Sequence, residues 1–255
     1  KGRTIGQLIK TWIVARLNLK TSHEWICLGQ KPNSQEEQNS VPLIPTSLSW
    51  FIIQLFVPSL FGRKIGMNAF LYVIVSVFLL RVKMAKGRDL SFGDNEIKKL
   101  FDTRLDSVAR DFNRASTRRC EIPSANAYAC ALALAKVAES IAAALNGRPS
   151  KLLSKNGCDE AHANPVKEKM FGIPCRFTNA GWCLFGDDES KQLEDMQRCG
   201  YIGWMGYGGS VLQWHKNLDI GFGYAMNLME REMNNHRAKI LQKAVVECTR
   251  AAMMP

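Results

Sequence analysis

The sequence predicts an α+β fold, with helices in the first two-thirds of the chain and strands in the last third. Up to residue 170 the apolar residues recur at helical spacing, whereas beyond it short apolar runs alternate with turns that contain Gly, Asn and Asp. The 255 residues are 46% hydrophobic and 22% charged, which is a globular composition long enough for a sizeable core. We therefore expect a mainly helical part over 1–170, and strands followed by a closing helix over 171–255.

The first predicted element is an amphipathic helix over residues 4–19. Its apolar side chains follow the i, i+3, i+4, i+7, i+8 pattern of one helix face: Ile5, Leu8, Ile9, Trp12 and Ile13. Residues 29–40 are polar and contain Gly, Pro, Asn and Ser, so we expect a loop there. Residues 41–45 predict a short extended piece, because each proline disfavours helix at the residue before it.

An apolar segment over residues 48–82 is the least ordinary part of the sequence. Two apolar runs flank GRKIG, and each has about fourteen residues where a membrane-spanning helix needs roughly 20. Arg63 and Lys64 between the runs also make a poor transmembrane hairpin. We favour a buried helical hairpin or an apolar lid over a pocket, with membrane contact through 48–82 as the alternative.

Two further helices are predicted before the strands. Residues 94–114 fit a charged surface helix. Residues 120–147 are dominated by Ala, Leu and Val, with Ser124 or Asn126 available as the N-cap and Asn146-Gly147 as the C-terminal stop. The many alanines of this helix predict close packing against its neighbours.

The strand part begins after residue 170. Residues 171–188 predict strand, turn and strand, and further short strands are expected at 201–210, 211–216 and 219–227. Residues 217–219 (Asn-Leu-Asp) fit a hairpin turn between the last two strands.

The chain is expected to close with a helix over 234–252. The apolar face predicted for this helix includes Ile240, Leu241, Ala244, Val245 and Cys248.

The net charge of +11 raises the question of a nucleic-acid or anionic-lipid surface. The basic residues are interleaved with acids, as in KMAKGRDLSFGDNEIKKLFDTRLD, and no aromatic stacking platform accompanies them. We therefore favour a solvated helical surface and expect no nucleic-acid partner.

The histidines and cysteines show no spacing suited to a metal. The four histidines form no ligand motif, and a surface position is expected for His215. None of the eight cysteines lies in a C-x-x-C pair, which excludes the zinc-ribbon and thioredoxin signals. We expect neither metal nor cofactor. A chain of this length needs no disulfides, which favours a reducing, intracellular compartment.

Residues 203–210, GWMGYGGS, contain four glycines in eight positions. A glycine-rich phosphate loop leads from a strand into a helix, whereas this stretch leads into VLQWHK, which has strand character. The sequence therefore indicates a bulged or bent strand in which glycine permits a kink or a close backbone approach. The approaching group can be a neighbouring strand or a ligand.

Four stretches follow one another in a recognisable order: KGRTIGQLI to LNLK, then LIP, then CEIPSANAYACALALAKV, and then YIGWMGYGGSVLQWHKNLDIGFGYAMNLM. Together they resemble the C-terminal portion of the β-lactamase-related serine hydrolases, which include class C β-lactamases, esterases and penicillin-binding-protein-like enzymes. The resemblance implies a β-lactamase/transpeptidase-like fold, with an antiparallel sheet flanked by helices beside a helical lobe. It also implies that 1–255 is a partial domain with an incomplete sheet.

The chemistry that the resemblance implies is acyl transfer from an ester, amide or peptide. In the family a Ser of Ser-x-x-Lys attacks the carbonyl, a Tyr of Tyr-x-Asn assists proton transfer, and a Lys or His on a Gly-rich strand stabilises developing charge. No Ser in this chain has Lys three positions later, and no Tyr is followed at the second position by Asn. The family places both motifs upstream of KGRTIGQLI, so we expect them before Lys1.

The third family element maps onto the Gly-rich stretch. Many relatives have Gly-His-x-Gly-x-Gly-Gly where this chain has Gly203, Trp204, Met205, Gly206, Tyr207, Gly208 and Gly209. The resemblance puts the backbone N–H of Tyr207 near the oxyanion and puts Trp204, a neutral donor, at the His or Lys position. We expect no catalytic residue in this chain and no activity from it alone. The alternative is a non-catalytic binding or scaffold protein with the same fold.

Overall fold

A computed structural model of the chain describes residues 2–19, 24–45, 105–170, 173–184, 200–206, 208–229 and 236–254. The apolar segment 48–82 therefore lies outside the described residues, as do residues 94–104 of the predicted charged helix. No helix in the described ranges is both long enough and apolar enough to cross a membrane.

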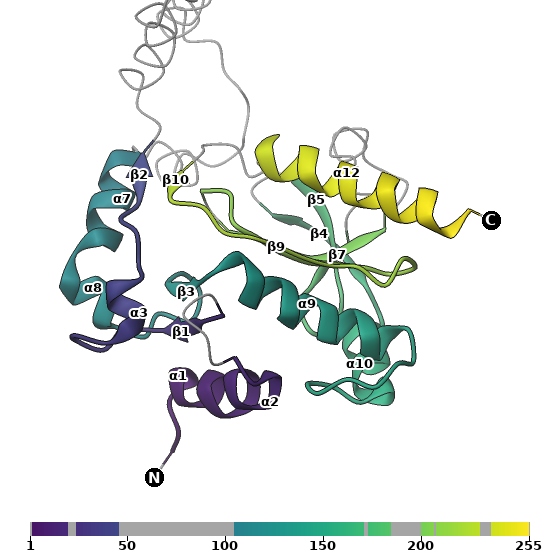
Figure 1. Cartoon of the computed structure of the whole chain (residues 1–255), viewed down its shortest axis with the longest axis horizontal. Helices are drawn as coiled ribbons and strands as arrows, with labels where there is room; N and C mark the ends of the chain where they lie inside the picture. The colour runs from purple at the N-terminus through teal and green to yellow at the C-terminus, as the bar shows by residue number, and fades with distance from the viewer. Residues whose placement is uncertain are drawn as a thin grey trace, which may run out of the picture.

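The centre of the described fold is a six-stranded antiparallel sheet in which every strand pairs with its neighbour in the chain. The strands are β4 (Val166–Met170), β5 (Ile173–Phe177), β6 (Cys183–Leu184), β7 (Tyr201–Met205), β8 (Val211–His215) and β9 (Gly221–Tyr224), in that spatial order. Helix α9 (Ala131–Leu145) covers one face of the sheet and α12 (His236–Met253) lies across the other (Figure 1). The predicted α+β fold with an antiparallel sheet flanked by helices is confirmed.

The predicted strands all appear, although each is shorter than its predicted range. β5 and β6 fall within 171–188, and the turn at 217–219 joins β8 to β9. β4 was not predicted. It is a strand at one edge of the described sheet, and its Val166, Lys167 and Glu168 are all exposed, so it lacks the alternation of a half-buried strand.

Helix α9 packs so closely on β9 that only glycine fits the strand beneath it. A Cβ on Gly221 would lie 2.2 Å from the backbone nitrogen of Glu139, and one on Gly223 would lie 2.4 Å from the carbonyl oxygen of Ala131. The core on this side combines α9 with the even-numbered positions of β7 and β8, namely Val137, Ala138, Ile141, Ala142, Ala144, Ile202 and Trp214, together with Cys158. The close packing predicted from the alanines of this helix is thereby confirmed.

The start of α9 differs from the prediction. The helix begins at Ala131 and is capped by Cys130, whose sulfur accepts a hydrogen bond from the backbone N–H of Ala133 at 3.4 Å. Asn126 is not a cap. Its buried side chain instead binds the preceding loop, where it donates to the carbonyl of Cys120 at 2.7 Å and accepts from the N–H of Ile122 at 2.9 Å. The Asn146-Gly147 stop is confirmed, with Gly147 at φ +73°.

The closing helix is present as α12, but the apolar face predicted for it is not the face that packs against the sheet. The side chains that it buries or half-buries against the sheet are Ala238, Gln242, Val246 and Thr249. Gln242 is fully buried and its amide nitrogen donates to Gln213 Oε1 of β8. The predicted apolar face, which includes Leu241 and Val245, is exposed.

The N-terminal helix is present but is not uniform. It runs as α1 (Ile5–Leu8), a π-helical stretch η1 (Ile9–Val14) and α2 (Ala15–Leu17), and Thr4 caps its start with a capping box. Ile13 and Leu17 pack against the α9 side of the core. Trp12, predicted on the same apolar face, is 55% exposed.

Short elements connect this helix to the sheet. β1 (Ile26–Leu28) pairs antiparallel with β3 (Ala127–Ala129), and β2 (Ile44–Pro45) pairs parallel with β10 (Leu228–Met229). The extended piece predicted at 41–45 is confirmed by β2. The other described helices of this part are α3 (Gln35–Gln38), α7 (Leu105–Asn113) and α8 (Ala115–Arg119). The loop predicted over 29–40 therefore contains one short helix, α3.

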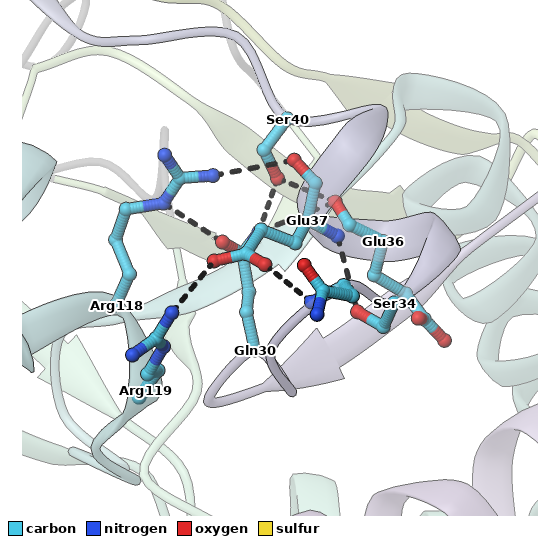
Figure 2. A network of polar contacts seen from close by, with 8 residues as sticks. Gln30, Ser34, Glu36, Glu37, Ser40, Arg118 and Arg119 are labelled. Carbon is cyan, nitrogen blue, oxygen red and sulfur yellow. Dashed lines mark hydrogen bonds and ion pairs between the residues drawn. The ribbon is translucent and has the colours of Figure 1, made fainter. Parts of the chain in front are cut away.

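A buried polar network ties α3 to α8 (Figure 2). Gln30 is 2% exposed; its amide oxygen accepts a 2.8 Å hydrogen bond from Arg118 Nε, and its amide nitrogen donates to the hydroxyl of Ser40. Beside it, Arg119 pairs with the carboxylate of Glu37 at 3.7 Å. Since each buried group in this network has a partner, its role is to hold the helical lobe together.

Candidate functional site

The Gly-rich stretch singled out in the sequence folds as a β-hairpin that lies between β6 and β9 of the sheet. β7 and β8 pair over their whole length, with Tyr201 opposite His215 and Met205 opposite Val211. The connection closes through a 2.7 Å bond from the N–H of Gly206 to the carbonyl of Ser210. The structure thus brings Gly203, Trp204, Gly206, Gly208 and Gly209 together in one hairpin, whereas Tyr207 lies outside the described residues.

Gly203, Gly208 and Gly209 all have positive φ, which favours glycine, and the first two also lie against neighbouring atoms. Gly203 has φ +132°, and a Cβ on it would lie 2.4 Å from the carbonyl oxygen of Leu212 in the neighbouring strand. Gly208 has φ +97°, and its Cβ would lie 3.0 Å from the side chain of Met229. The interpretation as a strand in which glycine permits close backbone approach is confirmed, and at Gly203 the approaching group is β8.

Gly206 differs from these two glycines. A Cβ there would meet nothing closer than the carbonyl oxygen of Ser210 at 3.6 Å, which is ordinary contact. Neither packing nor a positive φ explains the glycine at this position. Neither contacts with neighbouring atoms nor the backbone conformation therefore requires a glycine at position 206.

Trp204 is the one exposed residue of β7. It is 37% exposed, whereas Tyr201, Ile202, Gly203 and Met205 are buried. Its ring lies against that of Phe177 in β5, with centroids 6.0 Å apart and the planes tilted by 38°. Trp204, which the sequence resemblance assigns to the family's His or Lys position, presents a neutral aromatic surface.

His215, expected at the surface, is buried at 4% exposure, so that prediction is wrong. Its Nδ1 accepts hydrogen bonds from the backbone N–H groups of Asn217 and Leu218, both at 3.1 Å. Its ring meets Tyr201 edge-on with centroids 5.2 Å apart. The side chain thus holds the β8–β9 turn, a use of histidine that spacing in the sequence does not reveal.

A second histidine, His162 at the end of α10 (Lys155–His162), lies in an aromatic cluster that the sequence did not indicate. Its ring contacts both Trp182 and Trp214, with centroids 4.8 and 5.7 Å away. Nε2 accepts a 2.9 Å bond from the indole N–H of Trp214, and Nδ1 donates to the carbonyl oxygen of Cys158 at 2.7 Å. Burial lowers the pKa of this imidazole. With both nitrogens engaged, His162 anchors α10 to β8 and has no nitrogen free to act as a base.

Three of the described cysteines are not activated thiols. Burial raises the pKa of Cys27 and of Cys183 to about 12, and it also raises that of Cys158. A nucleophilic cysteine needs a lowered pKa, so these three are structural. Across the described ranges, no group of three or more His, Cys, Asp or Glu side chains is placed to hold a metal ion.

Neither a protein-family model nor a curated protein matches the sequence. Solved structures do match the fold. A family VIII carboxylesterase superposes with a TM-score of 0.57 at 17% identity, covering 97% of this chain and 52% of its own. A novel penicillin-binding protein homologue from Caulobacter crescentus superposes with a TM-score of 0.56 at 18% identity, covering 96% of this chain and 53% of its own.

At these identities the comparison establishes the fold, and the chain spans about half the length of the structures that it matches. The helices and the antiparallel sheet therefore form part of a β-lactamase/transpeptidase-like fold.

Proposed function

We propose that this chain is a partial or degenerate β-lactamase-related serine hydrolase that forms one wall of an acyl-transfer site. The observation that carries the proposal is the β7–β8 hairpin, an inner antiparallel strand pair with an exposed Trp204. The sequence resemblance assigns Trp204 to the position of the family's charged donor. Its superposition on a carboxylesterase fold supports acyl transfer from an ester, amide or peptide as the chemistry of the complete protein.

Acyl transfer requires a nucleophile and preorganised donors for the oxyanion. In this proposal the oxyanion donor is the backbone N–H of Tyr207, which the resemblance assigns to that role, because the N–H groups of Gly206 and Gly209 donate to carbonyls within the hairpin at 2.7 and 3.0 Å. The 255 residues contain neither Ser-x-x-Lys nor Tyr-x-Asn. The chain alone therefore binds or borders the acyl group without cleaving it.

Trp204 bears on which acyl groups the site accepts. A Lys or His at this position would attract a negatively charged substrate group, whereas the indole is neutral and lies against Phe177. The proposed substrate therefore carries no carboxylate beside its scissile carbonyl and presents an apolar or aromatic group to this wall.

Labelling with a serine-reactive fluorophosphonate tests the proposal. We expect the protein isolated from its source to be labelled, and the 255-residue chain expressed alone to remain unlabelled. Labelling of the isolated chain would contradict the absence of a nucleophile. An unlabelled native protein would favour the non-catalytic scaffold, to which the missing motifs and the neutral Trp204 also lend support.

Selectivity tests the role of Trp204. In the native protein without the label, Trp204→Lys should raise the hydrolysis rate of an ester with an adjacent carboxylate, relative to its uncharged analogue, by about tenfold, which equals one interaction of about 1.4 kcal/mol. Trp12→Lys is the matched control, because Trp12 is 55% exposed and lies in the N-terminal helix. An equal change in both variants would remove Trp204 from the site.

A further inference from the structure

Two buried cysteines meet on neighbouring strands beside the candidate site. Cys175 lies in β5 and Cys183 in β6, and the pairing of the strands sets Phe177 directly opposite Cys183. Since side chains two positions apart on a strand share a face, Cys175 lies on the same face of the sheet as Cys183. Both cysteines belong to the core cluster between the sheet and α12.

The two thiols interact with each other. Both are free, Cys175 with 6% of its surface exposed and Cys183 with none. Burial is the main cause of the raised pKa of Cys183, and the neighbouring thiol of Cys175 adds to it, both through its charge and as a hydrogen-bond partner. Two thiols held side by side are the arrangement from which a disulfide forms, and the proposed acyl transfer uses neither of them.

Burial sets the order in which the two thiols would react. Cys175 retains some exposure, so a small oxidant such as hydrogen peroxide reaches it first. The raised pKa of Cys183 makes this thiol a poor nucleophile toward a molecule in solution. Toward an oxidised sulfur already beside it, a small thiolate fraction suffices, because the reaction is intramolecular. Cys183 therefore fits the role of a resolving thiol, which differs from that of a catalytic nucleophile.

We propose that Cys175 and Cys183 are a peroxide-sensitive dithiol that closes into a disulfide between β5 and β6. In the first step the Cys175 thiolate attacks one oxygen of hydrogen peroxide, the O–O bond breaks, and Cys175 becomes a sulfenic acid as hydroxide leaves. In the second step the Cys183 thiolate attacks that sulfur, the S–S bond forms, and the sulfenic oxygen leaves as hydroxide. The two hydroxides take up the two thiol protons. Two thiols thus lose two electrons, and one peroxide becomes two waters.

Closing the disulfide changes the wall of the candidate site. Diagonal neighbours on antiparallel strands stand about 7–8 Å apart at Cα, whereas a disulfide spans about 4.4–6.8 Å. β5 and β6 must therefore approach each other at Phe177, which is opposite Cys183 and whose ring lies against Trp204. Oxidation is thereby coupled to the Phe177–Trp204 contact. The coupling rests on the proposed function, whereas the disulfide does not.

Peroxide treatment followed by peptide mapping tests for the disulfide. In the native protein, exposed thiols such as Cys120 and Cys248 are first blocked with N-ethylmaleimide. Hydrogen peroxide is then added and removed with catalase, and the unfolded protein is alkylated with iodoacetamide before digestion without reductant. Arg176 lies between the two cysteines, so trypsin releases them on separate peptides, 170–176 and 177–191, unless a disulfide joins them.

We expect these two peptides as a linked pair, two hydrogen masses lighter than their sum, and we expect dithiothreitol to separate them. The pair should exceed any other intramolecular pair roughly tenfold or more. Peroxide that leaves both cysteines as thiols overturns the proposal, as does conversion of Cys175 to sulfinic or sulfonic acid without a link. If the pair forms no more readily in the folded protein than in urea, the contact between the strands is not its cause, and the proposal also fails.

Variants assign the disulfide and its effect on the site. Cys175→Ala and Cys183→Ala should each abolish the linked pair, whereas Cys158→Ala removes a fully buried thiol from the other core cluster and should preserve it. Oxidation should change the rate of fluorophosphonate labelling of the native protein by about threefold or more, reversibly, and should not change it in Cys175→Ala. An unchanged rate with the linked pair present overturns the coupling to Trp204. A native protein that is never labelled counts against the proposed function, and the linked pair then still decides the disulfide.

Discussion

Replacing Gly203 by alanine tests whether the hairpin glycines serve the fold. The added Cβ would lie 2.4 Å from the carbonyl oxygen of Leu212 and 2.9 Å from the Cα of Gln213. Both are backbone atoms of β8, so β7 and β8 would have to separate to relieve the clash. Overpacking of this kind costs about 1–3 kcal/mol. The residue would also have to keep φ near +132°, which adds about 1–3 kcal/mol of backbone strain.

Together these effects predict a loss of about 2–6 kcal/mol, which for a domain of this size lowers the melting temperature by roughly 10 °C. The matched control is Gly206→Ala in the same hairpin, where the Cβ has 3.6 Å of clearance and the melting temperature should stay within about 2 °C of wild type. Thermal unfolding followed by circular dichroism measures both. If Gly203→Ala melts with the wild type, the proposed β7–β8 packing is wrong.

Three further predictions concern the packing and the buried polar groups. Gly221→Val should destabilise the protein by more than about 3 kcal/mol in urea, because the side chain would meet the backbone of α9 at Glu139 and Ala135; Gly2→Val, where nothing lies within 4 Å, should have no effect. Burial lowers the pKa of His162, so the unfolded state binds the extra proton and stability should fall as the pH drops below about 6.5; His162→Gln should flatten the dependence of the urea midpoint on pH between pH 7 and 5. Gln213→Leu alone should destabilise by about 1–3 kcal/mol by removing the acceptor of the buried Gln242 amide, and adding Gln242→Leu should recover part of that loss in a double-mutant cycle.

The sheet was the most predictable part of the fold. Alternating runs bounded by turn residues located β5 to β9, and the Asn-Leu-Asp turn at 217–219 was placed correctly. β4 was not predicted, because it is a charged strand at the edge of the described sheet and its Lys167 and Glu168 are both exposed. Periodicity detects a buried face, and this strand offers little of one.

Helix positions were predictable where local chemistry decides them. Asn146-Gly147 ends α9 as expected. The start of that helix was not predictable, because the side chain of Asn126 binds carbonyl groups of the preceding loop and does not cap the helix. Cys130 then becomes the cap, which local propensity does not indicate. Helix α12 shows the same limit, because its most apolar residues face outward and the sheet accepts Ala238 and Gln242 instead.

The sequence predicted where the candidate site lies, but only part of what its residues contact. Its glycines were identified from the sequence. Glycine is required at position 203 because the backbone of β8 lies against it, and the sequence pattern alone could not tell whether the approaching group is a strand or a ligand. The partner of Trp204, Phe177, comes from a strand 27 positions earlier in the chain. Such pairings follow from sheet order, and so they appear only once the strands are placed.

The most direct test of the proposed site is to ask what lies beside the reactive serine of the native protein. A fluorophosphonate that carries a diazirine on a short arm would first modify that serine and then, on irradiation, cross-link to its neighbours. We predict that the captured peptides include residues 203–210 of the β7–β8 hairpin. A labelled serine whose cross-links fall only on other parts of this chain, such as α10 or α12, would contradict the hairpin as a wall of the acyl-transfer site.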